Sequence, residues 1–110
     1  MKTNMRLRRV MIFVDETDKF HGKNLSTCIV EKAKQLGCGG ATVMRGIIGF
    51  GSHKRVHTAA LVDLSISLPE VILIIESPEL VDSLLKELEQ MLKEGLVVID
   101  DVDAIKYSQS

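Results

Sequence analysis

The sequence PEVILIIESPELVDSLLKELEQMLKEG, residues 69–95, decides the fold because it joins a strand signal to a helix signal. A run of five aliphatic residues predicts a buried strand over residues 70–76. Ser77, Pro78 and Glu79 then provide an N-cap, a proline at the first helical position and an acid in the first turn. Apolar residues follow at helical spacing: Val81, Leu84, Leu85, Leu88, Met91 and Leu92. The stretch therefore predicts a strand and then a helix that stops at its closing glycine.

The same signals continue on both sides of this stretch. We predict strands over residues 7–14, 41–50 (interrupted by Gly46) and 96–99, a helix over residues 25–36, polar loops over residues 15–23 and 51–60, and an extended or edge strand over residues 102–107. The resulting order is β-α-β-β-α-β, the ferredoxin-like arrangement of an α+β fold. One domain over residues 1–110 suits a chain of this length.

The strands predict self-association. Both helices of this arrangement lie on one face of the sheet, so a lone chain should have strands that alternate between apolar and polar residues. Residues 10–14 and 71–75 are apolar throughout instead. We therefore expect a second copy of the chain to cover the other face, in a closed cyclic oligomer.

Composition excludes several classes of protein. The 14 Lys and Arg against 15 Asp and Glu leave a net charge of −1, which is not the basic balance of a nucleic-acid binder. No apolar run reaches the roughly 18 residues of a membrane span, and the charged N-terminus does not have the form of a signal peptide. Cys28 and Cys38 have no C-x-x-C partners. We expect a reduced, cytoplasmic protein that is not embedded in a membrane.

A glycine-rich and basic segment is the candidate binding site. Residues 37–58 hold six of the eight glycines, and Gly49 and Gly51 run into Lys54, Arg55 and His57. Glycine backbone can approach an anion closely, and the cations supply positive charge, which is how phosphates are held. The alternative is a solvated glycine-containing loop.

No catalytic constellation is identifiable, so we do not expect an enzyme. Acidic residues cluster after the first and last strands: Asp15, Glu16, Asp18, Asp100, Asp101 and Asp103. Acids at strand ends are most often solvated turn residues. His53 and His57 are four residues apart, but they lie in a predicted loop without a third ligand, so no metal site is predicted there.

Several motifs resemble the PII signal-transduction proteins. They are Ala41-Thr42-Val43, Gly49-Phe50-Gly51, His57-Thr58 and Leu68-Pro69. A closer resemblance is to a PII-like group known as domain of unknown function 190. Its shared features are Gly22-Lys23, Ile29-Val30-Glu31-Lys32-Ala33, Gly40-Ala41-Thr42-Val43, Arg45-Gly46-Ile47, Glu94-Gly95-Leu96-Val97 and Val102.

This resemblance implies a homotrimer with a ligand cleft between subunits. It places Thr42, Gly49 and Gly51 at the cleft, with Lys54, Arg55 and His57 in the following loop. The PII loop rich in Gly and Lys, and the C-terminal arginines, have no counterparts here, so sensing of ATP and 2-oxoglutarate is not carried over. The cofactor is thus unknown, and a nucleotide is one small anionic ligand that fits.

The resemblance also implies a regulatory role. We expect a ligand-sensing protein that signals through residues 51–60 to an enzyme or to a transporter, because some members are encoded near fluoride-exporter-type membrane proteins. Two alternatives stay open: a scaffold with no ligand, and a trimeric metal-responsive protein like the copper-tolerance relatives. The candidate ligands of that metal are His21, His53, His57, Cys28 and Cys38.

Overall fold

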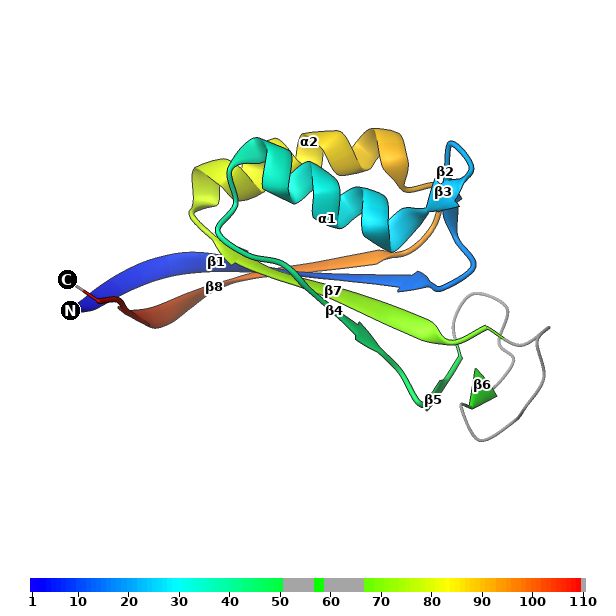
Figure 1. Ribbon diagram of the computed structural model, residues 1–110, viewed down its shortest axis with the longest axis horizontal. Coiled ribbons are helices and arrows are strands. Elements are labelled where there is room, and N and C mark those ends of the chain that lie inside the picture. Colours follow the sequence, from blue (N-terminus) through cyan, green and yellow to red (C-terminus); the bar gives the residue numbers. More distant parts are fainter. Residues whose placement is uncertain (51–56, 59–66, 110) are drawn as a thin grey trace.

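A computed structural model describes residues 1–50, 57–58 and 67–109 of the chain. One four-stranded antiparallel sheet has the order β4-β7-β1-β8, and two helices cover one of its faces (Figure 1). The sheet consists of β1 (Lys2–Asp15), β4 (Thr42–Arg45), β7 (Pro69–Glu76) and β8 (Leu96–Tyr107), and the helices are α1 (Leu25–Leu36) and α2 (Pro78–Met91). Two short pairs complete the elements: β2 (Lys19–Phe20) with β3 (Lys23–Asn24), and β5 (Ile48–Gly49) with β6 (His57–Thr58). The predicted ferredoxin-like order of two helices and an antiparallel sheet is confirmed.

The helix ends follow local sequence signals. Asn24 caps α1 by accepting a hydrogen bond from the backbone N–H of Thr27, and Gly37 ends the helix in the left-handed conformation. Ser77 caps α2 in the same way, as predicted. That helix ends at Met91 rather than continuing to Gly95, because the chain is already extended at residue 92. Gly95 instead makes the turn into β8 with a φ of 137°.

The core lies between the sheet and the helices. The side chains that face the helices include Val10 and Ile12 of β1 and Ile72 and Ile74 of β7, all of which are fully buried. They pack against Ile29, Ala33, Val81, Leu84, Leu88 and Met91 of the two helices. Burial of each large aliphatic side chain contributes about 1.5–3 kcal/mol, so this layer is a large favourable term in the stability of the fold.

The predicted strand over residues 41–50 is two strands. β4 stops at Arg45: the N–H of Gly46 still bonds to the carbonyl of Pro69 at 2.8 Å, in register with the ladder, but Pro69 has no N–H to return the bond. Residues 48–49 then pair with β6 in a separate sheet. The interpretation of Gly46 as an interruption is confirmed, because this glycine follows the last residue of β4.

The predicted loop over residues 15–23 holds a small hairpin. β2 and β3 pair across a turn in which His21 and Gly22 have φ values of 50° and 79°. The ring of His21 stacks on that of Phe20, with 4.0 Å between ring centroids. The turn lies directly before α1 and so fixes the entry to that helix.

β1 and β8 continue to pair with each other beyond the point where β7 ends, and this long two-stranded part is called the ribbon. Their pairing runs from Phe13 with Leu96 to Lys2 with Tyr107, whereas β7 pairs with β1 only up to Arg8. The ribbon therefore extends past the helices to the two chain ends, as Figure 1 shows. Residues 102–107, which were predicted to extend the last strand or to form a short edge strand, are the second half of β8.

Apolar side chains cover the sheet face that points away from the helices. Because directly paired residues share a face, the pairing places Phe13, Val71, Leu96 and Met44 together on that side. The exposed members are Phe13, Met44, Ile75, Leu96 and Val98, which are 36–59% exposed. The prediction that the strands are apolar on both faces is thus confirmed. The covering copy stays a prediction, because the structure holds one chain.

Candidate ligand-binding site

Two glycines press against one proline where β4 leaves the sheet. A Cβ atom on Gly46 would lie 2.8 Å from Cγ of Pro69, and one on Gly49 would lie 2.9 Å from the same atom. Distances below 3.0 Å are shorter than a Cβ contact allows, so a side chain at either position would force Pro69 or the backbone of that residue to shift. The backbone of Gly46 and that of Gly49 are therefore packed against Pro69, the first residue of β7.

The structure brings Gly49 and His57 together. They are direct partners in the β5–β6 pair, next to the pair of Ile48 with Thr58. Of His57 the structure describes the backbone alone. Gly51, Lys54 and Arg55 lie outside the described residues, so their roles in the site stay predictions.

Thr42 lies elsewhere in a single chain. It pairs with Leu73 of β7, which is four residues beyond Pro69. At the rise of a β-strand this separates Thr42 from the level of Gly49 by about 13 Å. The side chain of Thr42 also belongs to the open apolar face, because Leu73 pairs with Met11 there. Among the predicted site residues that the structure describes, a single chain therefore does not bring Thr42 close to Gly49 and the backbone of His57.

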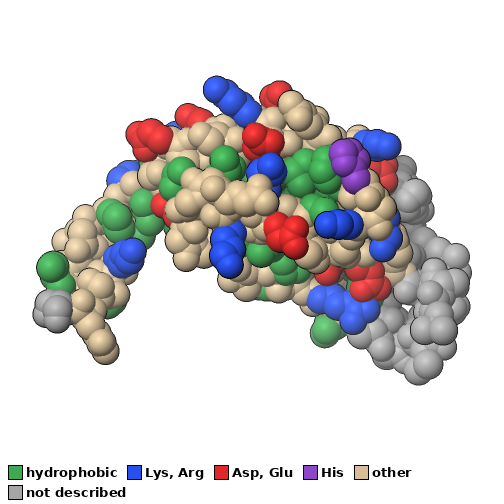
Figure 2. All heavy atoms as spheres, turned by 45° about the horizontal axis from the view of Figure 1, so that its top comes forward, with side chains coloured by type: hydrophobic (Ala, Val, Ile, Leu, Met, Phe, Trp, Pro, Cys, Tyr) green, Lys and Arg blue, Asp and Glu red, His purple; other side chains and the backbone are tan. Residues whose placement is uncertain are grey.

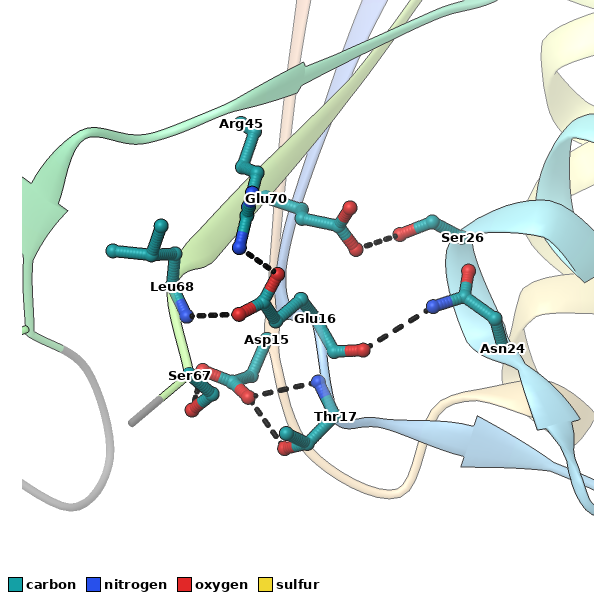
Figure 3. A network of polar contacts seen from close by, with 9 residues as sticks. All are labelled: Asp15, Glu16, Thr17, Asn24, Ser26, Arg45, Ser67, Leu68 and Glu70. Atoms are coloured by element: carbon teal, nitrogen blue, oxygen red, sulfur yellow. Dashed lines mark hydrogen bonds and ion pairs between the residues drawn. The ribbon is translucent and has the colours of Figure 1, made fainter. Parts of the chain in front are cut away.

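Glu16 contacts both Arg45, at the end of β4, and Leu68, just before β7 (Figure 3). Its Oε1 accepts a hydrogen bond from the N–H of Leu68 at 3.0 Å, and its Oε2 lies 2.7 Å from Nη2 of Arg45. The N–H of Glu16 also donates to the carbonyl of Leu68 at 3.0 Å. One carboxylate thus holds the end of β4 beside the residue that precedes β7.

Neighbouring polar side chains extend this network into helix α1. Ser26, which is buried in the first turn of α1, donates to Oε1 of Glu70 at 2.8 Å. Asn24 donates to the carbonyl of Glu16, and Ser67 donates to Oδ1 of Asp15 at 2.9 Å. The interpretation as a solvated turn residue was wrong for Glu16, because its carboxylate binds Leu68, which is 52 residues away in the sequence. Asp15 is a turn residue, since it accepts hydrogen bonds from the N–H and the hydroxyl of Thr17, but its carboxylate also binds the distant Ser67.

The second acidic cluster was also misinterpreted. Asp100, Asp101 and Asp103 lie within β8, and each pairs across the ribbon with an arginine of β1: Arg9, Arg8 and Arg6. The spacing Arg-x-Arg-Arg in β1 mirrors the spacing Asp-Asp-x-Asp in β8, as an antiparallel pair requires. That mirrored spacing is the sequence signal that would have predicted the register.

Two of the candidate metal ligands, Cys28 and Cys38, are separated along α1. Cys28 lies in the helix and Cys38 follows its end, so about 12 Å of helical rise, from Cys28 to Leu36, lies between them. Burial and the nearby Glu76 carboxylate raise the pKa of the Cys38 thiol, which disfavours the thiolate that binds metals. Among residues 1–50, 57–58 and 67–109, no three His, Cys, Asp or Glu side chains come together as a metal site.

Charges of both signs alternate over the helical side of the molecule. Figure 2 shows Lys, Arg, Asp and Glu side chains mixed over the face that α1 and α2 form. Within the described part of the chain, no helix is long and apolar enough to cross a membrane. Two shallow hollows lie on the β1–β8 ribbon, the first of them lined by Met1, Lys2, Tyr107, Ser108 and Gln109.

Curated proteins of similar sequence carry no functional name. A UPF0166 protein of Aquifex aeolicus (strain VF5) is 35% identical over 101 residues, covering 92% of this chain and 95% of that protein. A UPF0166 protein of Methanocaldococcus jannaschii is 31% identical over 103 residues, covering 93% and 94%.

Solved structures with the same fold are PII-like. CPII from Thiomonas intermedia K12, bound to ADP and bicarbonate, has a TM-score of 0.63 at 21% identity, covering 93% of this chain and 91% of that one. A putative PII-like signaling protein from Thermus thermophilus has a TM-score of 0.63 at 18% identity, covering 92% and 90%. These likenesses identify the fold as PII-like. The profile of the family DUF190, described as uncharacterized ACR, matches residues 7–104, and this chain therefore belongs to that family.

Proposed function

We propose that this protein is a PII-like ligand sensor that binds a small anionic ligand in a cleft between the subunits of a homotrimer. The observation that carries the proposal is the packing of Gly46 and Gly49 against Pro69, with Gly49 paired to His57. The N–H of Gly46 is already bonded to Pro69, so we assign the contacts with the anion to the backbone around Gly49 and to the cations predicted from the sequence, Lys54 and Arg55. A nucleotide is the first candidate ligand, since the similarly folded CPII binds ADP and bicarbonate.

The open sheet face supports assembly. Five large apolar side chains stand exposed on it in a single chain, and soluble monomers rarely leave a patch of this kind uncovered. A closed ring of three copies would cover the face of every subunit. It would also bring Thr42, which lies on that face, close to a neighbouring subunit.

The output of the sensor is a protein partner. We assign its contact to residues 51–60, with Gly51, Lys54 and Arg55 shared between ligand and partner, and we expect a transporter or an enzyme in that role. The location we propose is the cytoplasm, where the two separate cysteines stay reduced.

Thermal unfolding with a ligand panel tests the proposal. The panel holds ADP, AMP, cyclic dinucleotides, bicarbonate, fluoride and divalent metals, and sedimentation gives the oligomeric state. A ligand at 100 times its Kd should stabilise the fold by about 2.7 kcal/mol per site. Arg55→Ala should abolish the shift, while Lys86→Ala, on the exposed side of α2, should keep it.

Each other outcome contradicts the proposal in a different way. A shift with a divalent metal alone would support the metal-responsive alternative. No shift with any member of the panel, on an intact oligomer, would favour a scaffold. A monomer at micromolar concentration would remove the cleft between subunits.

A further inference from the structure

Glu16 and Arg45 are held by very different numbers of contacts. Glu16 is only 23% exposed, and Leu68 fixes both its backbone and its side chain. Arg45 is 58% exposed, and its one ion pair among the described residues is with Glu16. If this ion pair breaks, the carboxylate therefore stays in place and the guanidinium is released.

Arg45 borders the candidate site along the chain, and its side chain lies on the helix side of the sheet, because its strand partner Glu70 pairs with the buried Val14. It is the last residue of β4, and the next residue is Gly46, which packs against Pro69 together with Gly49. The guanidinium has five N–H donors in a planar fork, and a single nitrogen lies against Glu16. The remaining donors match the bidentate geometry with which arginine binds phosphates and carboxylates.

We infer that Arg45 is a ligand-binding residue of the anion site, and that Glu16 occupies it as an internal competitor until an anion takes its place. This inference rests on the proposed function. An exposed ion pair is weak, so a multiply charged anion can displace one carboxylate oxygen. Glu16 keeps its bonds to Leu68 after the exchange, so it acts as a positioning residue that sets the affinity and does not itself touch the ligand.

The two partners of the pair should therefore have opposite effects on binding. Arg45→Ala removes charge-assisted hydrogen bonds to the ligand and should weaken ADP binding about 10-fold or more. Arg45→Lys, which keeps the charge but loses the fork, should fall between this variant and the wild type. Glu16→Gln keeps an oxygen for the N–H of Leu68 but frees Arg45, and should tighten ADP binding by about 2- to 5-fold.

A matched control distinguishes the effect of freeing Arg45 from the effect of removing a negative charge near the site. Glu70 is the direct strand partner of Arg45, yet its carboxylate bonds to Ser26. Glu70→Gln removes the same charge from the same region without freeing Arg45, and should tighten binding less than Glu16→Gln does. The double variant Glu16→Gln with Arg45→Ala should bind ADP no better than Arg45→Ala alone.

Calorimetric titration of the intact oligomer with ADP gives all these affinities. A purely structural ion pair would make Glu16→Gln and Arg45→Ala change the affinity in the same direction, which would overturn the inference. Unchanged affinity in both variants, with ADP bound by the wild type, would overturn it as well and leave the proposed function standing. Failure of the wild type to bind ADP would overturn this inference together with the nucleotide assignment.

Discussion

Arg9 and Asp100 face each other across β1 and β8 and are joined by two parallel hydrogen bonds. Nε of Arg9 lies 3.0 Å from Oδ1 of Asp100, and Nη2 lies 2.7 Å from Oδ2. The hydrogen bonds from Arg9 lower the pKa of the Asp100 carboxyl, and those from Arg8 lower that of Asp101. The pair stands at the border between the four-stranded sheet and the two-stranded ribbon. Arg8, the residue before Arg9, is the outermost residue of β1 that still pairs with β7.

These carboxylates predict a loss of stability in acid. A carboxyl whose pKa is lower in the folded chain stabilises the fold above its ordinary pKa of about 3.8 and loses that contribution as the pH falls through the folded pKa. Asp100→Asn with Asp101→Asn should therefore be less stable than the wild type at neutral pH, and its stability should fall less below about pH 4. Urea unfolding at several pH values measures both effects. Glu89→Gln, on α2, is the control and should keep the wild-type acid dependence.

A second prediction concerns the glycine at the end of β4. Gly46→Ala places a Cβ 2.8 Å from the ring of Pro69 and 3.3 Å from its carbonyl oxygen, so the backbone has to shift. Forced overpacking of this kind should cost about 1–3 kcal/mol of the free energy of unfolding. Gly40→Ala, where nothing lies within 4 Å of the added atom, is the matched control and should change stability little. Equal stabilities for the two variants in urea would contradict the packing of Gly46 on Pro69.

A third prediction tests the core. Leu84 of α2 is fully buried between the helices and the sheet. Leu84→Ala should lower the free energy of unfolding by about 2–5 kcal/mol, because it loses apolar burial and leaves a cavity. Lys86→Ala on the same helix should be nearly neutral. Chemical unfolding at fixed protein concentration compares the two, and a cost below about 1 kcal/mol for Leu84→Ala would contradict its place in the core.

A fourth prediction concerns the open face of the sheet. Val98→Lys puts a charge on the face that we expect another copy to cover, because Val98 pairs with Met11 there. This variant should dissociate the oligomer in sedimentation experiments, since an unpaired charge is costly to bury. Ile105→Lys lies on the opposite face of the same strand and is 50% exposed, so it should leave the assembly intact. Dissociation by Ile105→Lys alone would instead assign the interface to the other side of the ribbon.

Local patterns predicted the helices well. The apolar spacing of residues 25–36 and the triplet Ser77, Pro78 and Glu79 lie within the elements that they specify, so no distant contact is needed to interpret them. The strands were predicted at the right places in the sequence, but their first and last residues were not. Strand ends depend on pairing partners, and the partner of Lys2 is Tyr107, at the other end of the chain.

The residues of the ligand site stay a prediction. Gly46 was predicted as an interruption of a strand and Gly49 as backbone close to an anion, and the sequence could not show that both glycines pack on Pro69. Lys54 and Arg55 lie outside the described residues, whereas Arg45, which sequence analysis did not include among the site residues, stands at the described edge of the site. Its partner Glu16 lies 29 positions earlier, and no periodicity links them.

The sequence by itself determined the order of the main helices and strands, the N-cap of the second helix and the two apolar faces of the sheet, because each depends on neighbouring residues and their spacing. Only the tertiary structure decided that Glu16 joins Arg45 to Leu68, and that the three aspartates of β8 meet the arginines of β1. These contacts join residues 29 to 97 positions apart, and they form only when the sheet has brought its strands into register.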